Sequence, residues 1–469
     1  MDCDILVIGA GSAGLSVAAG AAQMGARVVL LEKGEMGGDC LNYGCVPSKA
    51  LLAAAARAQD MREAGGFGIA PVAPQVDYAA VMEHVAGAIA TIAPHDSQAR
   101  FEGLGVTVIR AHGRFTGPRT VVADGTEITA RRVVIAAGAA PLVPPIAGLD
   151  TVPYLTNETL FDGTELPGHL LILGGGPIGM EMAQAHARLG SRVTVIEAGR
   201  ALGKDDPEMA AAVLDRLRYE GVEIAEGARA ARVSGQAGAL TVEAEDGRRF
   251  GGTHLLVALG RKPNVDGLGL EAAGITVERG AIKVDARLRT TNPRVYAIGD
   301  ITGGLQFTHL AGYEAGVVIR SVLFGLPAKA RYDHIPRVTY TDPELAQVGL
   351  TEAEARAAHG DRLEIVTESY AGNDRAIATR RTEGRIKLMA VKGRPVGVSI
   401  VGAEAGELIA LWALALSRGL SLKDVAGMVA PYPTLGELGK RAAGTYFSPK
   451  LFDNIWVKRA VRTVQRLLP

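Results

Sequence analysis

The sequence has 469 residues, enough for about three domains with buried cores, and 48% of them are hydrophobic. Its 50 Lys and Arg residues balance 50 Asp and Glu residues, so the formal net charge is zero. No overall electrostatic field therefore favours the binding of nucleic acid. Gly, Arg or Glu interrupts each apolar run, which argues against a membrane-spanning helix. The chain has only three cysteines, and its first residues predict a strand rather than the apolar core of a signal peptide. We therefore expect a cytoplasmic protein.

The N-terminal segment has the pattern of a dinucleotide-binding unit. Residues 5–8 predict an apolar strand, which is followed by a glycine-rich turn and an Ala-rich helix. The turn contains Gly9, Gly11 and Gly14. A second strand, 27–31, ends in Glu32, which lies 18 residues after the third glycine. In such units the glycines let the backbone approach a pyrophosphate, and the acidic residue binds ribose hydroxyls.

A cysteine pair, Cys40 and Cys45, follows this unit closely. A structural disulfide across so short a loop would add only about 2 kcal/mol by loop entropy. A zinc or iron–sulfur site needs about four soft ligands, which the chain lacks, so we expect no metal site. The remaining use of such a cysteine pair is thiol–disulfide exchange. Because Pro47 suits a first helical turn, Cys45 is predicted at a helix N-terminus, where the dipole and Lys49 favour a thiolate.

A second copy of the dinucleotide pattern follows between residues 170 and 197. Residues 170–173 predict an apolar strand, and the next strand, 192–196, ends in Glu197. This acid again lies 18 residues after the third glycine of a turn made by Gly174, Gly176 and Gly179. One glycine motif alone is a weak signal, but two complete copies predict two bound dinucleotides.

Three further strands indicate how the units are connected. Residues 131–138 and 255–264 predict buried strands with crossover turns, and Gly138 and Gly260 in these turns are predicted to contact the cofactors. The strand that starts at residue 295 places Asp300 at its carboxyl end, where ligands bind in α/β sheets. We therefore expect the second unit to be inserted into the first. The expected boundaries are 1–147 and 265–335 for the first domain and 148–264 for the inserted one.

The pattern of predicted strands and helices changes after about residue 336. Segments 339–341, 385–391 and 396–401 have strand patterns and alternate with Ala-rich helices, which predicts a third, α+β domain over 336–450. Residues 451–469 are set apart as a basic amphipathic tail.

A helix is predicted within this tail, over residues 454–468. Val457, Val461, Val464 and Leu468 fall on one stripe, with Trp456 at its edge. The opposite side carries Lys458, Arg459, Arg462 and Arg466. Such a helix can lie on an anionic membrane, dock on an acidic partner or pack on its own dimer, and the last arrangement is the commonest.

The two nucleotide units and the Cys40–Cys45 segment resemble the class I pyridine nucleotide–disulfide oxidoreductases, which include lipoamide dehydrogenase, glutathione reductase and mercuric reductase. The resemblance covers almost the whole chain. It implies that the first unit binds FAD, the second binds NAD(P)H and the third domain forms a homodimer interface. Hydride then passes from nicotinamide to flavin and on to the disulfide. A small disulfide or dithiol, or a protein-bound lipoyl group, would be the substrate.

The same resemblance implies roles for individual residues. Cys45 matches the charge-transfer thiol beside the flavin, and Cys40 matches the interchange thiol that attacks the substrate. Lys49 and Glu181 match an ion pair beside the isoalloxazine ring. Two more residues are predicted to contact the flavin cofactor, Asp300 and His309. Without the family pattern, Glu181 is better explained as a favourable charge near a helix N-terminus, and His309 is equally explained as a packing histidine.

Glu197 also bears on the choice of reductant. A carboxylate at this position accepts hydrogen bonds from ribose hydroxyls and repels a phosphate on that ribose. The sequence therefore favours NADH over NADPH.

The run from Tyr432 to Glu437 departs from most of the family, whose members have His-Pro-Thr-x-x-Glu here. Tyrosine has a reference pKa near 10, against about 6.5 for histidine, and accepts protons poorly at neutral pH. Mercuric reductases resemble this chain in having Pro-Tyr here, but they end in a cysteine pair that this tail lacks. We expect a lipoamide-dehydrogenase-like enzyme. The alternatives are a metal-ion reductase and a membrane- or complex-docked electron-transfer flavoprotein.

Overall fold

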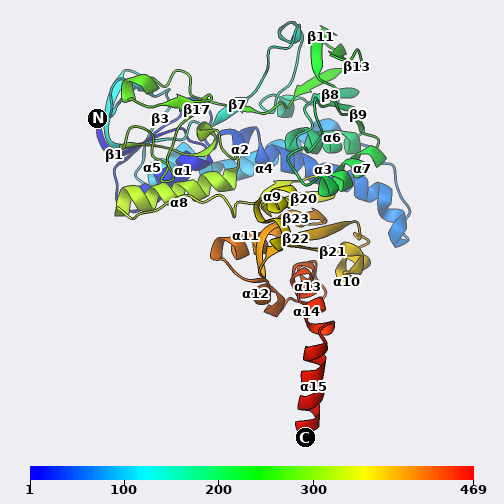
Figure 1. Cartoon of the computed structure of the whole chain (residues 1–469). Helices are drawn as coiled ribbons and strands as arrows, with labels where there is room; N and C mark the ends of the chain where they lie inside the picture. Colours follow the sequence, from blue (N-terminus) through cyan, green and yellow to red (C-terminus); the bar gives the residue numbers. More distant parts are fainter. Residues whose placement is uncertain (469) are drawn as a thin grey trace. The chain divides into compact units, whose positions relative to one another are not determined.

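The computed structural model describes residues 1–468 and divides into two compact units, which are described one at a time. Unit 1 comprises Met1–Ala64, Ala70–Ala198 and Ala225–Arg331. Unit 2 comprises Gly65–Ile69, Gly199–Ile224 and Tyr332–Pro469. Figure 1 shows the elements in chain order by colour.

The first sheet of unit 1 has the order β3-β2-β1-β6-β5-β4, and β18 also pairs with β6. Its central strands are β1 (Asp2–Ile8), β2 (Val28–Leu31) and β6 (Thr126–Ile135). β1 is parallel to both neighbours, with Val7 opposite Leu30 on one side and Val134 on the other. The outer strands are β3 (Thr107–Ile109), β4 (Arg114–Phe115), β5 (Thr120–Ala123) and β18 (Val295–Ala297). Parallel strands buried on both faces need continuous apolar runs, and β1 and β2 have them.

In the sequence, the strands of the second sheet of unit 1 come between two segments that form the first sheet. Its parallel strands are β8 (His169–Leu173), β9 (Arg192–Ile196) and β14 (His254–Val257). An antiparallel sheet accompanies them, made of β11 (Ala230–Gln236), β12 (Ala239–Ala244) and β13 (Arg249–Gly252). After these strands the chain returns to the first sheet through β18, which pairs with β6. The expected insertion of one dinucleotide unit into another is confirmed.

Helices follow both glycine turns of unit 1. α1 (Ser12–Gln23) follows β1, and α6 (Pro177–Leu189) follows β8. The other helices of this unit are α2 (Gly38–Asn42), α3 (Cys45–Glu63), α4 (Tyr78–Ile92), α5 (Gln98–Gly103) and α8 (Thr308–Phe324). Two short strands, β7 (Ala139–Pro141) and β15 (Arg261–Pro263), pair antiparallel between the two sheets.

Unit 2 is built on a five-stranded antiparallel sheet of order β19-β20-β23-β22-β21. Its strands are β19 (Arg337–Thr339), β20 (Glu344–Gly349), β21 (Leu363–Ser369), β22 (Gly384–Val391) and β23 (Arg394–Gly402). The predicted strand at 339–341 is wrong beyond Thr339, because Thr341 donates its hydroxyl to the carbonyl of Pro343 in the turn before β20. The buried ring of Trp412 belongs to the core beneath this sheet.

The helices of unit 2 include α7, which comes from a distant part of the sequence. They are α7 (Pro207–Tyr219), α9 (Glu352–His359), α10 (Asp374–Ala378), α11 (Ala405–Arg418), α12 (Leu422–Gly427), α13 (Glu437–Thr445), α14 (Ser448–Phe452) and α15 (Ile455–Leu467). In Figure 1, α15 (red) extends away from the sheet of its own unit. No helix within residues 1–468 is long and apolar enough to cross a membrane.

Candidate functional site

The first and third glycines of both turns are required by the backbone. Gly9 and Gly174 have φ values of +105° and +109°, and a Cβ on either would lie 2.4 Å from a backbone carbonyl oxygen. A Cβ on Gly14 would lie 1.8 Å from the carbonyl oxygen of Gly9, and one on Gly179 would lie 2.0 Å from that of Gly174. Only glycine lets each helix approach its strand this closely.

The middle glycine of each turn faces open space instead. A Cβ on Gly11 would have its nearest neighbour at 3.9 Å, and one on Gly176 would meet nothing within 4 Å. A side chain at either position would fill this space. Each turn therefore leaves room for a pyrophosphate at a helix N-terminus, as a dinucleotide requires.

The two predicted ribose ligands are each held at the glycine turn of their own fold. Glu32 accepts hydrogen bonds from the backbone N–H groups of Ala10 and Gly34, both at 2.6 Å. Glu197 accepts one from the N–H of Gly175 at 2.7 Å. The same contact recurs in both copies, so each carboxylate lies beside the space in front of its turn.

The other two predicted cofactor glycines flank the β7–β15 pair. Gly138 and Gly260 have φ values of +67° and +116°, and a Cβ on either would meet nothing within 4 Å. The carbonyl of Gly138 accepts a hydrogen bond from the N–H of Asn264, and that of Gly260 accepts one from the N–H of Leu142. Their role as cofactor contacts stays a prediction.

The cysteine pair lies where the short helix α2 is followed by the longer helix α3. Cys40 is in α2, and Cys45 is the first residue of α3, as predicted. Both are free thiols in this structure. The sulfur of Cys45 lies 3.3 Å from the hydroxyl oxygen of Thr308, which is the first residue of α8. Two helix N-termini therefore meet at this sulfur, and both favour negative charge on it.

The surroundings of the pair move its two pKa values in opposite directions. The contact with Cys40, then the Thr308 hydroxyl and the charge of Lys49, lower the pKa of Cys45 to about 6. The same contact with Cys45, together with burial, raises the pKa of Cys40. These two directions favour the thiolate at Cys45 and the protonated thiol at Cys40.

Lys49 lies one helical turn after Cys45 and forms an ion pair with Glu181. The distance between Nζ and Oε2 is 2.8 Å, and the side chain of Glu181 is only 6% exposed. Because Lys49 is in α3 and Glu181 is in α6, the pair links the cysteine helix to the helix of the second glycine turn. The structure thus brings these two predicted residues together, and their role beside a flavin stays a prediction.

Asp300 belongs to a charged cluster that the sequence did not reveal. Nε of Arg261 lies 3.3 Å from a carboxylate oxygen of Asp300, and Nη1 lies 3.2 Å from one of Asp39. Asp39 also accepts a hydrogen bond from the amide of Asn157 at 2.9 Å. Burial raises the pKa of Asp300, and Arg261 opposes that rise. The buried Nε of Arg261 is ion-paired with Asp300, although no acceptor among the described residues meets it with good hydrogen-bond geometry.

His309 is the second residue of α8 and follows Thr308 directly. Its ring stacks on Phe307 with a centroid distance of 5.2 Å and an angle of 10°. His309 is exposed, and it lies next to the residue that contacts the Cys45 sulfur. Its proposed approach to the flavin stays a prediction.

Tyr432 and Glu437 belong to unit 2, whereas the cysteine pair belongs to unit 1. The Tyr432 side chain is largely exposed, and its hydroxyl donates to Asp374 at 2.8 Å, a contact that raises the pKa of Tyr432. Glu437 is the first residue of α13 and accepts weakly from the N–H of Thr434 at 3.4 Å. Their part in proton transfer stays a prediction.

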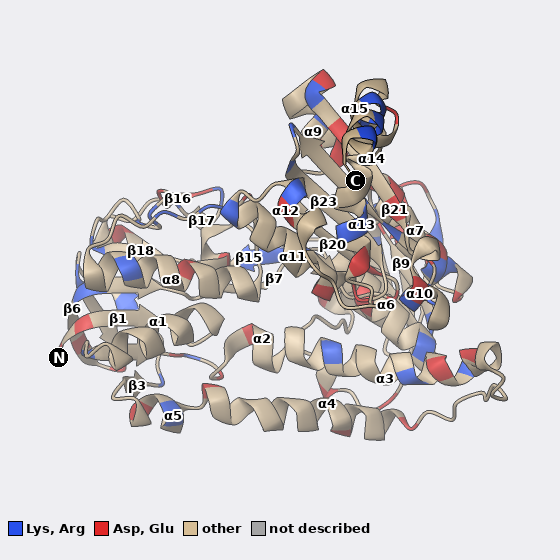
Figure 2. Cartoon of the chain, turned by 90° about the horizontal axis from the view of Figure 1, so that it is seen from below, with Lys and Arg blue, Asp and Glu red and all other residues tan. Residues whose placement is uncertain are grey.

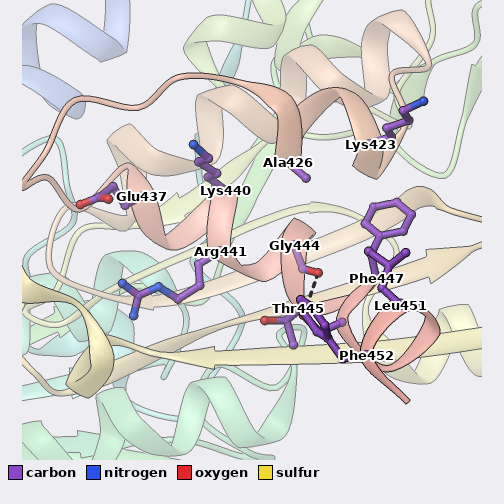
Figure 3. A pocket seen from close by; sticks show the side chains of 11 residues that line it. Lys423, Ala426, Glu437, Lys440, Arg441, Gly444, Thr445, Phe447, Leu451 and Phe452 are labelled. Carbon is purple, nitrogen blue, oxygen red and sulfur yellow. Dashed lines mark hydrogen bonds between the residues drawn. The ribbon is translucent and has the colours of Figure 1, made fainter. Parts of the chain in front are cut away.

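Glu437 also borders a cavity of about 710 Å³ in unit 2, between α12, α13 and α14. Phe447, Leu451 and Phe452 gather on one side of it (Figure 3). Its lining also includes three cations, Lys423, Lys440 and Arg441. Within residues 1–468, no cluster of His, Cys, Asp or Glu is arranged to hold a metal ion.

Sequence comparisons extend over nearly the whole chain. Residues 3–315 match the family described as pyridine nucleotide-disulphide oxidoreductase, and residues 335–443 match its dimerisation domain. Mercuric reductase of Streptomyces lividans is 38% identical over 463 residues, which cover 95% of this chain and 96% of that protein. Dihydrolipoyl dehydrogenase of Bacillus subtilis (strain 168) is 36% identical over 446 residues, covering 92% and 96%.

Solved structures agree with these relatives. The HOCl-induced flavoprotein disulfide reductase RclA from Escherichia coli is 30% identical with a TM-score of 0.84, and the match covers 94% of this chain and 99% of that one. LpdA from Mycobacterium tuberculosis is 28% identical with a TM-score of 0.88, covering 94% and 99%.

Proposed function

The chain belongs to the pyridine nucleotide-disulphide oxidoreductase family, and on that premise we propose that its redox centre is the Cys40–Cys45 pair. It is an FAD-dependent enzyme that passes electrons from a nicotinamide cofactor to a disulfide acceptor. The observation that carries our assignment is the position of Cys45 at two helix N-termini, with its pKa lowered to about 6. A thiolate held in this way is ready for electron transfer and exchange.

The residues of the first glycine turn fit FAD. When bound, FAD takes a hydride from the nicotinamide and delivers two electrons to the disulfide. Gly11 leaves room for the pyrophosphate, Glu32 offers a ribose acceptor, and Arg261 forms an ion pair with Asp300, the proposed cofactor contact. Lys49 and Glu181 supply a fixed ion pair one turn from Cys45.

The reduced pair can then pass its electrons to an acceptor disulfide. Cys40 attacks one acceptor sulfur to form a mixed disulfide, and its proton goes to the sulfur that leaves. The Cys45 thiolate next attacks the Cys40 sulfur, which restores the Cys40–Cys45 disulfide and releases the second acceptor sulfur as a thiolate, which takes its proton from solvent. Because the thiolate is the nucleophile, Cys40 must lose its proton as it attacks, while Cys45 is already the thiolate for the second step.

A Cys40→Ala variant tests this assignment. We expect NADH still to reduce its bound flavin, while turnover of a small disulfide such as lipoamide is lost. Cys3→Ala is the matched control, since Cys3 is buried in β1 and should not affect turnover. Undiminished disulfide reduction by Cys40→Ala would show that another group transfers the electrons.

NADH is the proposed reductant. Glu197 holds its carboxylate at the second glycine turn, where it would accept from ribose hydroxyls and repel a phosphate on that ribose. Stopped-flow reduction of the flavin should therefore be faster with NADH than with NADPH, and Glu197→Ala should narrow the difference. The reverse order in the unmodified protein would contradict this role of Glu197.

Metal-ion reduction is a second candidate. It is favoured by the mercuric reductase relatives and by tyrosine at position 432 in place of histidine. NADH oxidation that depends on Hg(II) in excess thiol, and that exceeds turnover of lipoamide, would favour this alternative.

The match to the dimerisation domain supports a homodimer. We propose a small disulfide or dithiol, or a protein-bound lipoyl group, as its substrate, and the cytoplasm as its location. Size-exclusion chromatography with light scattering tests the dimer directly.

A further inference from the structure

We propose that α15 binds the surface of an anionic lipid bilayer, a role that is independent of the proposed redox function. The helix begins at a defined point, because the Asn454 side chain accepts hydrogen bonds from the N–H groups of Trp456 and Val457. Every side chain of α15 is exposed except that of Val457, which is half-buried. α15 is therefore a formed helix whose surface is available for binding.

Six of the seven apolar side chains of α15 form one continuous arc, and the seventh, Ile455, lies on the opposite side. At 100° per residue, positions 457, 461 and 464 lie within about 60° of one another, and positions 456, 460 and 467 extend the arc on one side. The members of this apolar arc are Trp456, Val457, Ala460, Val461, Val464 and Leu467. The exposed fractions of Trp456 and Leu467 are 71% and 78%, which is unusual for such large apolar residues.

The opposite arc carries only positive charge. Its charged residues are Lys458, Arg459, Arg462 and Arg466, and residues 454–468 contain no acid. Figure 2 shows these cations on α15. Because the whole chain is neutral, this excess of four positive charges is a local property of the helix. Such a basic face complements anionic headgroups and is typical of interfacial helices.

Trp456 and Arg459 lie at one border of the two arcs. The Arg459 guanidinium is 5.0 Å from the centre of the Trp456 ring. Tryptophan prefers the headgroup level of a bilayer, and a long Arg side chain can reach water while its stem covers apolar surface. The two residues thus suit a helix that lies in the plane of the interface.

A second copy of the chain is a less suitable occupant. The match to the dimerisation domain ends at residue 443, before α15 begins. In unit 2, Leu451 and Phe452 of α14 line the cavity in Figure 3, so α14 is the last helix with side chains in that cavity. A solvated helix on a protein surface usually carries both signs of charge, whereas α15 carries one.

Vesicle co-sedimentation of the FAD-loaded protein tests the proposal. We expect binding to phosphatidylcholine vesicles that contain phosphatidylglycerol, about tenfold weaker binding to phosphatidylcholine alone, and weakening by salt. Deletion of residues 454–469 should abolish binding while FAD content and flavin reduction by NADH stay intact. On vesicle addition, Trp456 fluorescence should shift to the blue, and Trp456→Phe should remove the shift because Trp412 is buried.

Point variants separate charge from apolar contact without removing the helix. Val461→Asp and the double reversal Arg462→Glu with Arg466→Glu should each reduce binding at least about tenfold. The matched control reverses two exposed cations of unit 1, Arg229→Glu with Arg249→Glu, and should leave binding unchanged. Equal affinity for uncharged vesicles would overturn the proposal. Release of monomers by the deletion, without vesicle binding of the intact protein, would instead assign α15 to the dimer.

Discussion

The lowered pKa of Cys45 comes from two neighbours in its own segment and from one that is distant in the sequence. Its sulfur contacts Cys40 and Thr308, and Lys49 adds charge from one turn away. The cysteine spacing and Lys49 could be found from the sequence, because they lie within one short segment. Thr308 could not, since it is 263 residues away and only the fold places the start of α8 at the sulfur. The contacts of Arg261 were not predictable for the same reason, although this residue directly follows Gly260.

Removing the Thr308 hydroxyl should raise the pKa of Cys45. A hydrogen bond to a charged group contributes about 1.5 kcal/mol or more, so Thr308→Ala should raise this pKa by about one unit. The measurement is the pH dependence of iodoacetamide alkylation of Cys45 in the reduced protein. Thr91→Ala is a matched control, because the Thr91 hydroxyl only donates to a carbonyl within its own helix. An unchanged alkylation profile in Thr308→Ala would contradict the contact.

Tyr432 should make the enzyme a poor oxidant of dihydrolipoamide at neutral pH. Its hydrogen bond to Asp374 raises its pKa further from neutrality, so its hydroxyl accepts a proton poorly. Tyr432→His should increase the rate at pH 7 by about tenfold or more, provided that the dimer lets Glu437 orient the new imidazole. In the unmodified protein the rate should rise towards alkaline pH.

Tyr432→Phe serves as the control, because it removes the hydroxyl without adding a base. Steady-state rates across a pH series measure all three proteins. Rapid dihydrolipoamide turnover by the unmodified protein at pH 7 would mean that another group takes the proton.

The strands and glycine turns of unit 1 were predictable because their patterns are local. Apolar runs, glycine spacing and the closing acid all fall within about 30 residues, and the observed strands agree with them. The placement of α7 was not predictable in this way. This helix lies in the segment 148–264, which the sequence predicts to form the inserted domain, whereas the structure has it as part of unit 2.

A buried ion cluster explains why α7 joins unit 2. Lys387 in β22 lies 3.0 Å from Asp206, 2.6 Å from Glu208 and 2.8 Å from Glu352. Its side chain and that of Asp206 are only 5% and 4% exposed. Asp206 also caps α7, because its side chain accepts from the N–H of Glu208. Lys387 lies 181 positions after Asp206, so no local pattern could reveal the contact.

Lys387→Ala should therefore destabilise unit 2 strongly. Removing its ammonium group leaves the buried carboxylate of Asp206 without a counter-charge, which costs about 3–5 kcal/mol. Denaturant unfolding followed by tryptophan fluorescence reports on this unit, since Trp412 and Trp456 are both in it. The exposed pair of Lys450 with Glu364 is the control, and Lys450→Ala should cost about 1 kcal/mol or less. Equal losses of unfolding free energy in both variants would show that the buried cluster contributes no more to stability than the exposed pair.

Across the whole molecule, chemistry and attachment are assigned to different parts of the chain. The glycine turns, the cysteine pair and the Lys49–Glu181 ion pair all belong to unit 1, while α15 is the last helix of unit 2. Family membership could be predicted from the sequence because its motifs are specific. The physiological acceptor could not, because the residues that would handle its protons depart from the family pattern at Tyr432.

The absorption spectrum of the FAD-loaded protein after two-electron reduction tests the central claim most directly. A thiolate at Cys45 beside the flavin should give a long-wavelength band. Because the pKa of Cys45 is lowered to about 6, the band should be full at pH 8 and should be lost as the pH falls below about 6. It should be absent from Cys45→Ser and unchanged in Cys3→Ala. A band that persists in Cys45→Ser, or none at pH 8 in the unmodified protein with FAD bound, would contradict the assignment of Cys45.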